Sequence, residues 1–367
     1  MLTVFTLDKG LELPRGFLDR YGESLQRQRV IEALFRQEGY ARGYTEVETP
    51  ILERAEALPS EFFAVWNKRN FLPVTLKDYN SEGKELATTR AMLRPEGTMP
   101  VCRFLATQLA QGNECLPARL IYAIDCYRNE AIESIKGNRL RQFNQLGVEC
   151  IGDSSQASDK EVILYAYELL RKIGLPREDI RIRMNNVNLF KDLCQWSDLN
   201  SIERATLQAR LDCFSKARAE GREYEDKPVI PYQGYTDGLN RGLQRRWAEL
   251  VNTYGNPSRE TSELDGGLID LIQGVRRKRV PAIIDTSVVR GYLYYTGLVF
   301  QIDARKQDGT WVAEIGGGGR YDELIGRNLQ IFGIERKVPA TGFAFGTERL
   351  IDVSRLPKGK YQVKMVI

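Results

Sequence analysis

Apolar and polar positions alternate along the first part of the chain in ways that predict a helix, a strand and a hairpin. In residues 24–42 the apolar side chains recur at helical spacing, and the segment ends near Gly43, which predicts a helix. Residues 45–49 alternate as a strand does and stop at Pro50. Residues 119–150 contain a nearly apolar stretch, a polar loop and an alternating stretch in succession. This order predicts a long antiparallel hairpin.

The clearest helical pattern covers residues 158–173, where Val, Leu, Ile, Ala and Tyr side chains share one face. Ser158 and Glu161 have the spacing of an N-terminal capping box. Gly174, followed by Pro176, predicts the end of the helix. We therefore expect one amphipathic helix packed against the core.

Strand patterns return in the last third of the chain. They cover residues 180–184, 282–284, 292–302 and 311–315. The glycine run 316–319 follows them, and we expect it to form a loop. Because helical blocks separate these strands without a βαβ rhythm, the pattern predicts an α+β fold, an antiparallel sheet with helices packed against it.

A chain of 367 residues is long enough for one large core and a smaller appendage. Residues 187–280 are charged and largely helical in pattern, unlike their surroundings, and we interpret them as a small, mostly helical insertion. The main body then comprises 1–186 and 281–355, and 356–367 reads as a strand or linker.

The composition excludes several kinds of site. The chain has no histidine, so a Ser-His-Asp triad, a Cys-His pair and histidine-containing metal sites are impossible. Its six cysteines are never spaced as C-x-x-C, and we expect ordinary thiols in a reducing compartment. No apolar stretch approaches the roughly 20 residues that span a bilayer, and the N-terminus lacks a signal pattern. These features predict a soluble, cytoplasmic protein.

The net charge of +4 neither requires nor excludes a nucleic-acid partner. Basic side chains cluster at Arg241, Arg245 and Arg246 and in the run 276–279. Each cluster is compatible with an RNA-phosphate contact and equally with a solvated helix face.

Candidate chemistry is spread over several short segments. They are 93–98, 128–130, 139–145, 290–297, 316–321 and 346–350. Arginines fixed on strands or at a helix start suit bidentate contacts with phosphate, and Phe143 offers a flat face for a purine. Glu96, Gln145 and Glu149 offer acceptors for an ammonium group or a ring N–H. Each segment alone is commonplace, but together they suit activation of a cationic small molecule by a nucleoside triphosphate.

In this order the segments resemble the class II aminoacyl-tRNA synthetases, and among them the histidyl-tRNA synthetase family. Residues 43–53 resemble the first class motif, which builds the family's dimer interface, residues 127–152 the second and residues 342–350 the third. Residues 290–300 and 317–324 are similar to the two histidine-specific signatures. The resemblance implies a class II catalytic core and a homodimer.

The resemblance also implies roles for single residues. In the ATP site, Arg128 would hold the α-phosphate, Phe143 and Arg349 would enclose adenine, Glu130 would face its amino edge, and Arg139 would contact the outer phosphates. In the histidine site, Glu96, Thr98 and Gln145 would take the amino group, Glu149 and Tyr295 the imidazole, and Tyr321 would line the pocket. Arg290 would steady the reacting carboxylate and α-phosphate, which makes Arg128 and Arg290 the implied catalytic residues.

The implied reaction fits the absence of histidine. Formation of an adenylate needs no protein base, because the substrate carboxylate is already the nucleophile. The expected cofactors are ATP and Mg²⁺, and we identify no metal ligands among the protein side chains. The expected partners are histidine and tRNA(His).

Two departures from the family pattern leave alternatives open. Leu293 stands where the family signature has an acid, and only about a dozen residues follow Arg355, where the family continues into an anticodon-binding domain of roughly one hundred residues. We therefore expect that domain to be absent from this sequence. The first alternative is the non-aminoacylating, histidine-sensing regulatory subunit of ATP phosphoribosyltransferase, whose partner is the catalytic subunit. The second is a paralogue that activates another amino acid or acylates something other than tRNA.

Overall fold

The computed structural model describes residues 12–54, 71–131, 135, 139–188, 190–191, 201–222, 266–289 and 294–357. Three predicted features lie outside these residues: the catalytic candidate Arg290 with its neighbour Leu293, the basic cluster around Arg245, and the strand or linker beyond residue 357.

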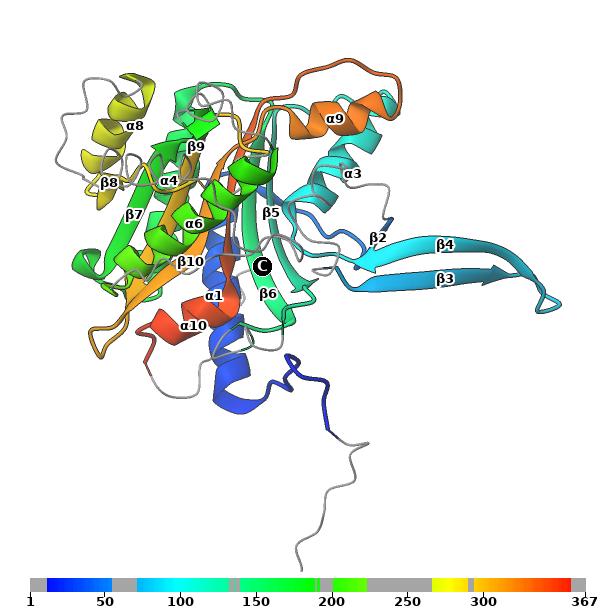
Figure 1. The fold of residues 1–367 in the computed structure, drawn as a ribbon, viewed down its shortest axis with the longest axis horizontal. Helices are drawn as coiled ribbons and strands as arrows, with labels where there is room; N and C mark the ends of the chain where they lie inside the picture. Colours follow the sequence, from blue (N-terminus) through cyan, green and yellow to red (C-terminus); the bar gives the residue numbers. More distant parts are fainter. Residues whose placement is uncertain are drawn as a thin grey trace, which may run out of the picture.

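A mixed eight-stranded sheet forms the centre of the molecule (Figure 1). In spatial order its strands are β1 (Thr45–Glu46), β5 (Ala118–Tyr127), β6 (Gln142–Ile151), β11 (Ala340–Gly346), β10 (Trp311–Arg320), β9 (Leu298–Arg305), β7 (Ile180–Asn186) and β8 (Ala282–Ile284). The pairs β1–β5 and β7–β8 at the two edges are parallel, and the inner pairs are antiparallel. The predicted α+β class is confirmed, with a parallel pair added at each edge.

The predicted hairpin over 119–150 is confirmed. β5 and β6 pair from Ala118 opposite Ile151 to Tyr127 opposite Gln142. Side chains of β6 alternate between the two faces of the sheet, since successive residues of a strand point to opposite sides. Leu146 and Val148 therefore belong to the main apolar core, whereas Phe143 packs against the second core cluster on the other face.

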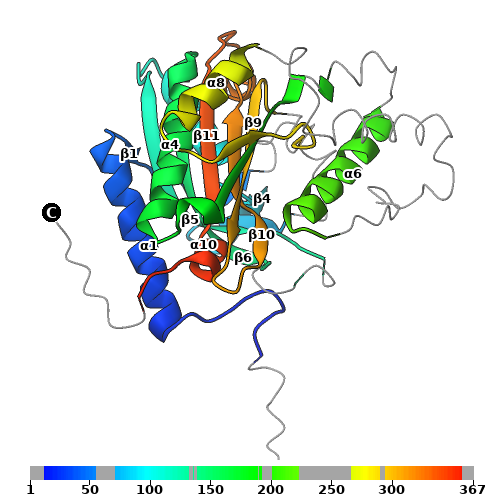
Figure 2. The same ribbon diagram turned by 90° about the vertical axis from the view of Figure 1, so that its left-hand side faces the viewer.

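Helices cover both faces of the sheet (Figure 2). The main core joins one face to α1 (Gly22–Ala41), α4 (Gln156–Lys172), α8 (Gly266–Arg276) and α10 (Thr347–Val353). On the other face, α3 (Thr98–Ala110) and α9 (Leu324–Gln330) pack against each other, and α6 (Ser201–Ala219) lies beside β10. A single turn of 3₁₀ helix, Arg177–Asp179, precedes β7. Within the described ranges, no helix is both long and apolar enough to cross a membrane.

A smaller three-stranded sheet projects from the body (Figure 1). Its strands are β2 (Leu52–Arg54), β4 (Glu85–Leu93) and β3 (Pro73–Tyr79). The chain leaves β4 through residues 94–97 and enters α3, which brings this connection beside the hairpin.

The described residues within 187–280 pack on two different faces of the main sheet. Leu268, Leu271, Ile272 and Val275 of α8 are buried in the main core together with α4. In contrast, α6 rests on the opposite face of the sheet, against β10.

The prediction of a capping box at Ser158 is wrong. α4 begins at Gln156 with Ser155 at its N-cap, so Ser158 lies in the first turn, where its hydroxyl donates to the Ser155 carbonyl oxygen at 2.7 Å. Glu161 binds Arg119 at 2.9 Å. An N-cap three residues earlier leaves the apolar face unchanged, which is why the helix itself was predicted correctly.

The loop predicted at the glycine run is also wrong, because Gly316–Gly319 lie inside β10 between β9 and β11. A Cβ atom at Gly318 would be 2.0 Å from the carbonyl oxygen of Gly342, and one at Gly316 would be 2.3 Å from the ring of Phe345. The run therefore marks close approach of neighbouring strands.

Gly318→Ala is expected to destabilise the protein by about 2–3 kcal/mol, because backbone atoms must move to admit the methyl group. Gly297→Ala is the matched control, since no atom lies within 4 Å of the added Cβ there. Urea unfolding of the two variants checks this. Equal midpoints for both variants would contradict the packing argument.

Candidate active site

A cavity of about 490 Å³ opens on the face of the sheet that carries α3 and α9. Its wall collects most of the predicted site residues: Glu96, Thr98, Arg128, Glu130, Arg139, Phe143, Gln145, Tyr295, Tyr321 and Arg349. Gly316, Gly317, Gly318 and Gly342 also line it. Since these glycines lack side chains, the sheet backbone itself forms part of the cavity surface.

Phe143 and Arg128 come together at one end of the cavity. Arg128 follows β5, and its Nε atom donates to the carbonyl oxygen of Pro95 at 2.9 Å. Its guanidinium carbon lies 4.9 Å from the centre of the Phe143 ring, which is a cation–π contact. Main-chain and ring contacts thus hold the guanidinium before any ligand binds.

Glu130 and Arg139 face each other across the hairpin loop. Arg139 binds the Glu130 carboxylate at 2.7 Å, and Arg141 donates to the Glu130 carbonyl oxygen at 3.1 Å. The Arg139 side chain is half exposed. The structure therefore brings the two residues predicted for the adenine edge and the outer phosphates into a direct ion pair.

Arg349 lies in the first turn of α10 and reaches the bulged part of β10. Its guanidinium donates to the carbonyl oxygens of Ala313, at 3.2 Å, and of Glu314. A bulge is frequent beside functional sites because it redirects main-chain groups. Here it directs two carbonyl oxygens to the arginine predicted to cover adenine.

Glu348 and Thr347 fasten the start of α10 to β6 at Asn144, the residue between Phe143 and Gln145. The Glu348 carboxylate accepts the Asn144 N–H at 2.9 Å, and the Thr347 hydroxyl donates to the Asn144 amide oxygen at 2.7 Å. Burial raises the pKa of Glu348, opposed by this N–H and by Arg20. These contacts fix the spacing between the Phe143 and Arg349 walls.

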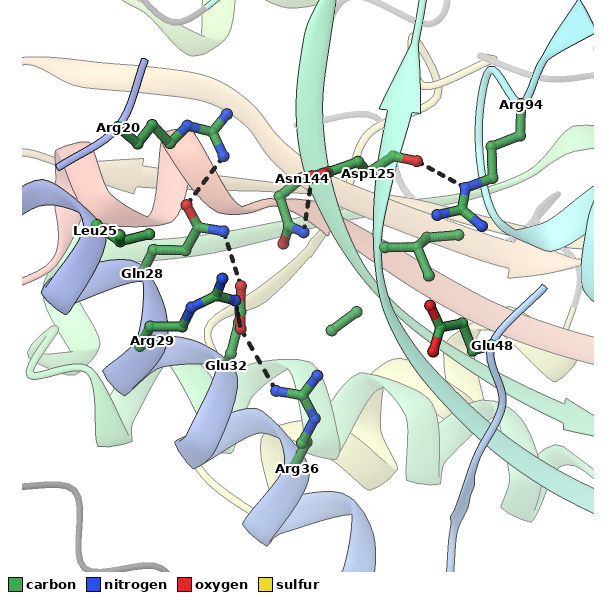
Figure 3. Close-up of a pocket in the computed structure, with 12 residues that line it drawn as sticks. Arg20, Leu25, Gln28, Arg29, Glu32, Arg36, Glu48, Arg94, Asp125 and Asn144 are labelled. Carbon is green, nitrogen blue, oxygen red and sulfur yellow. Dashed lines mark hydrogen bonds and ion pairs between the residues drawn. The ribbon is translucent and has the colours of Figure 1, made fainter. Parts of the chain in front are cut away.

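Arg20 supports the same contact from the opposite face of the sheet. It pairs with Glu348, and it donates to Gln28 of α1 at 3.0 Å. Gln28 donates to Glu32, which also binds Arg36 (Figure 3). This row lines a second, polar cavity of about 270 Å³. Sequence reasoning missed Arg20, which has no pattern around it that points to residue 348.

Glu149 lies beneath the other end of the cavity and is only 1% exposed. Thr98, at 2.7 Å, Tyr122, at 3.2 Å, and Tyr321 donate hydroxyl hydrogen bonds to its carboxylate. Burial raises the pKa of Glu149 to about 8, although these hydroxyl donors favour the ionised form. At neutral pH the carboxyl group is therefore mostly protonated.

Glu96 and Gln145 are both bound to the N-terminus of α3. The two Glu96 oxygens accept the N–H groups of Thr98, at 2.8 Å, and Met99, at 2.6 Å. Gln145 accepts the N–H of Gly97 at 2.7 Å. Burial raises the pKa of Glu96, opposed by the two main-chain N–H groups. Both side chains are therefore held by the main chain, with acceptor capacity left for a ligand.

Tyr295 lies in the cavity wall with Tyr294 beside it. Their hydroxyl oxygens are 3.0 Å apart, and Tyr294 also packs edge-on against Tyr321. Tyr294 was not among the predicted site residues, although it also lines the cavity. Further cavity residues that sequence reasoning missed are Lys216, Gln301 and Glu314.

The arrangement has one cationic, aromatic end and one end of hydroxyl and carboxyl groups. Among the described residues, no cluster of three or more cysteine, aspartate or glutamate side chains is placed to hold a metal ion. The cavity thus suits a ligand with an anionic, planar part and a polar, N–H-bearing part.

Comparison with known proteins identifies the family of the chain. The family model for histidyl-tRNA synthetase matches residues 16–350. A histidine–tRNA ligase of Sulfurisphaera tokodaii is 30% identical over 91% of this chain and 73% of its own length. One of Bartonella quintana is 31% identical over 97% of this chain and 74% of its own length.

Among solved structures, a Bacillus halodurans C protein is described as an ATP phosphoribosyltransferase regulatory subunit/histidyl-tRNA synthetase. It superposes with a TM-score of 0.65 at 22% identity, covering 94% of this chain and 83% of its own. At that identity the likeness supports the fold alone. The match over residues 16–350 and the relatives that are about 30% identical over most of the chain show that it belongs to the histidyl-tRNA synthetase family.

Proposed function

We propose that the protein activates histidine with ATP to histidyl-adenylate and transfers the histidyl group to tRNA(His). The proposal rests on one observation: a single cavity contains side chains suited to a nucleotide at one end and side chains suited to an imidazole at the other. Arg128, Phe143 and Arg349 suit a nucleotide, and Tyr295 and Tyr321, with Glu149 beneath them, suit an imidazole. A histidine sensor that does not use ATP has no physical need for the first set.

The proposed chemistry needs placement and charge rather than a protein base. The histidine carboxylate attacks the α-phosphorus of ATP, a new C–O–P bond forms, and pyrophosphate leaves. Arg128 would neutralise charge that develops on the α-phosphate. The tRNA 3′-terminal hydroxyl then attacks the carbonyl carbon, and AMP leaves, with a phosphate oxygen of the adenylate taking the proton.

Mg²⁺ is the expected metal, and the described residues offer it no closed set of protein ligands. Magnesium ions commonly keep several waters and bind to substrate phosphates with few protein carboxylates. The cavity therefore fits a metal that enters with ATP, where it would neutralise phosphate charge. We also propose a homodimer formed through residues 43–53, as in the resembling class.

The alternative is a regulatory subunit of ATP phosphoribosyltransferase that binds histidine without forming an adenylate. Leu293 favours it, because an acid at this position accompanies Arg290 in the family signature. The alternative predicts a stable complex with the catalytic phosphoribosyltransferase subunit.

Histidine-dependent ATP–pyrophosphate exchange by the full chain tests the proposal, with histidine binding measured by calorimetry in parallel. We expect exchange that requires histidine and collapses in Arg290→Ala. Histidine binding without exchange would reject the ligase and favour the regulatory subunit. Neither binding nor exchange would reject both and indicate a pocket rebuilt for another ligand.

A further inference from the structure

Glu314 has a backbone conformation that ordinary residues avoid. Its φ angle is 57°, in the left-handed region, and it lies at the bulge of β10 between Val312 and Gly316. Its side chain is 1% exposed. Such a conformation persists only where surrounding contacts enforce it, and such residues concentrate at functional sites.

Contacts with Asp303, Gln301 and Lys216 help to hold Glu314 in this conformation. The main-chain N–H of Glu314 donates to the Asp303 carboxylate at 3.0 Å, and Gln301 donates to the Glu314 side chain at 2.9 Å. The third is Lys216, whose ammonium group is 2.6 Å from the other carboxylate oxygen. Asp303 and Gln301 belong to β9, the neighbouring strand, but Lys216 comes from α6.

Lys216 supplies the charge that this buried carboxylate needs. A buried carboxylate is stable only when it is paired with a cation and hydrogen-bonded. Lys216 also binds Asp212 one turn earlier on α6, at 3.3 Å, but that pair is partly exposed. The helix is docked beside it, because Arg183 of β7 donates to the hydroxyl of Ser215.

The held bulge orients the nucleotide end of the cavity. The carbonyl oxygens of Ala313 and Glu314 both accept from the Arg349 guanidinium. Lys216, Gln301 and Glu314 line the same cavity as Arg349. A contact chain therefore runs from α6 through Glu314 to the arginine that encloses adenine.

We propose that Lys216 is a positioning residue for ATP: by pairing with Glu314 it holds the β10 bulge that orients Arg349, and so makes nucleotide affinity depend on the docking of α6. This inference rests on the proposed function. Loss of the Lys216–Glu314 contact is therefore expected to lower ATP affinity and to leave the histidine end of the cavity unchanged.

The test uses the full chain with Lys216→Met, which keeps most of the unbranched side chain and removes its charge, and Lys216→Arg, which restores the charge. ATP and histidine binding are measured separately by calorimetry, and folding is checked by thermal unfolding. We expect Lys216→Met to weaken ATP binding about tenfold, the effect of losing one charge-assisted contact, and to change histidine binding less than about twofold. Lys216→Arg should recover most of the ATP affinity.

The control is Arg222→Ala, which removes an exposed ion pair with Glu220 just beyond the same helix and should leave both affinities unchanged. If Lys216→Met does not fold, the double variant Lys216→Met/Glu314→Gln also removes the buried carboxylate charge and should still show the weaker ATP binding.

The outcomes distinguish the role of Lys216 from the proposed function of the protein. ATP affinity equal to wild type in a folded Lys216→Met protein overturns the inference and leaves the proposed function standing. Equal weakening of ATP and histidine binding also overturns it, because a purely structural role would affect both ends. A wild-type protein that binds no ATP rejects the proposed function, and the role of Lys216 with it.

Discussion

Replacement of Arg128 by glutamine is expected to lower the rate of histidine-dependent ATP–pyrophosphate exchange by about 10²–10³-fold. The Pro95 carbonyl, at 2.9 Å, and the Phe143 ring, at 4.9 Å, already hold the guanidinium in the cavity. A fixed cation stabilises developing phosphate charge without reorganising first. Glutamine keeps a polar amide but loses that charge, so the effect should fall on kcat more than on the KM for histidine.

Arg128→Lys should recover little of this loss, because an ammonium group lacks the planar fork that binds two phosphate oxygens. Arg119→Gln is the matched control: Arg119 lies on β5 and binds Glu161 on the surface at 2.9 Å. Steady-state exchange kinetics of the three variants measure the difference. An Arg128→Gln rate within about tenfold of wild type would contradict the assigned role.

Replacement of Glu149 by glutamine is expected to weaken histidine binding by about 10–100-fold. The protonated Glu149 can pass its proton to the imidazole of bound histidine, and the resulting carboxylate and imidazolium form a charge-assisted hydrogen bond, whereas the glutamine amide cannot transfer a proton and forms only a neutral one. The Thr98, Tyr122 and Tyr321 hydroxyl groups already point at this position, so glutamine fits the same space. Calorimetric titration with histidine measures the change, and ATP binding should stay near the wild-type value.

The same substitution should change how stability depends on pH. Burial raises the pKa of Glu149 to about 8, from 4.5 for an ordinary glutamate. Between these values the unfolded chain loses a proton that the folded protein keeps, so this carboxyl group makes wild-type stability fall as pH rises. The stability that the protonated Glu149 carboxyl group contributes to the folded protein is complete below pH 4.5 and is lost as pH rises through about 8.

Glutamine does not titrate, so Glu149→Gln should gain stability relative to wild type by on the order of 3–4 kcal/mol between pH 5 and pH 8. Chemical unfolding at several pH values measures this difference. Glu114→Gln, at an exposed glutamate outside the cavity, is the control and should track wild type. A Glu149→Gln difference that does not change with pH would mean that the folded carboxyl group titrates normally.

The local periodicity of apolar side chains was sufficient to predict much of the fold. The hairpin 119–150 and α4 depend on side chains that repeat every two or every three to four residues, and such repeats are visible in the sequence itself. Phe143, Gln145 and Glu149 share one face of β6, because every second residue of a strand points to the same side, but their roles were implied by the family resemblance. Where the signal was ambiguous, as at Ser158 or the glycine run, the prediction was wrong, since a helix start and a close strand approach depend on neighbours distant in sequence.

By itself, then, the sequence determined the α+β class, the hairpin and many of the residues that line the cavity, because local spacing and family motifs carry that information. Only the tertiary structure decided how those residues are held. The contact between Arg20 and Glu348 joins positions 328 residues apart, and the contact between Lys216 and Glu314 joins a helix to a strand bulge. The raised pKa of Glu149 arises from burial by several elements at once. Pairing, burial and desolvation act between segments that the folded sheet brings together, and no local pattern encodes which segments those are.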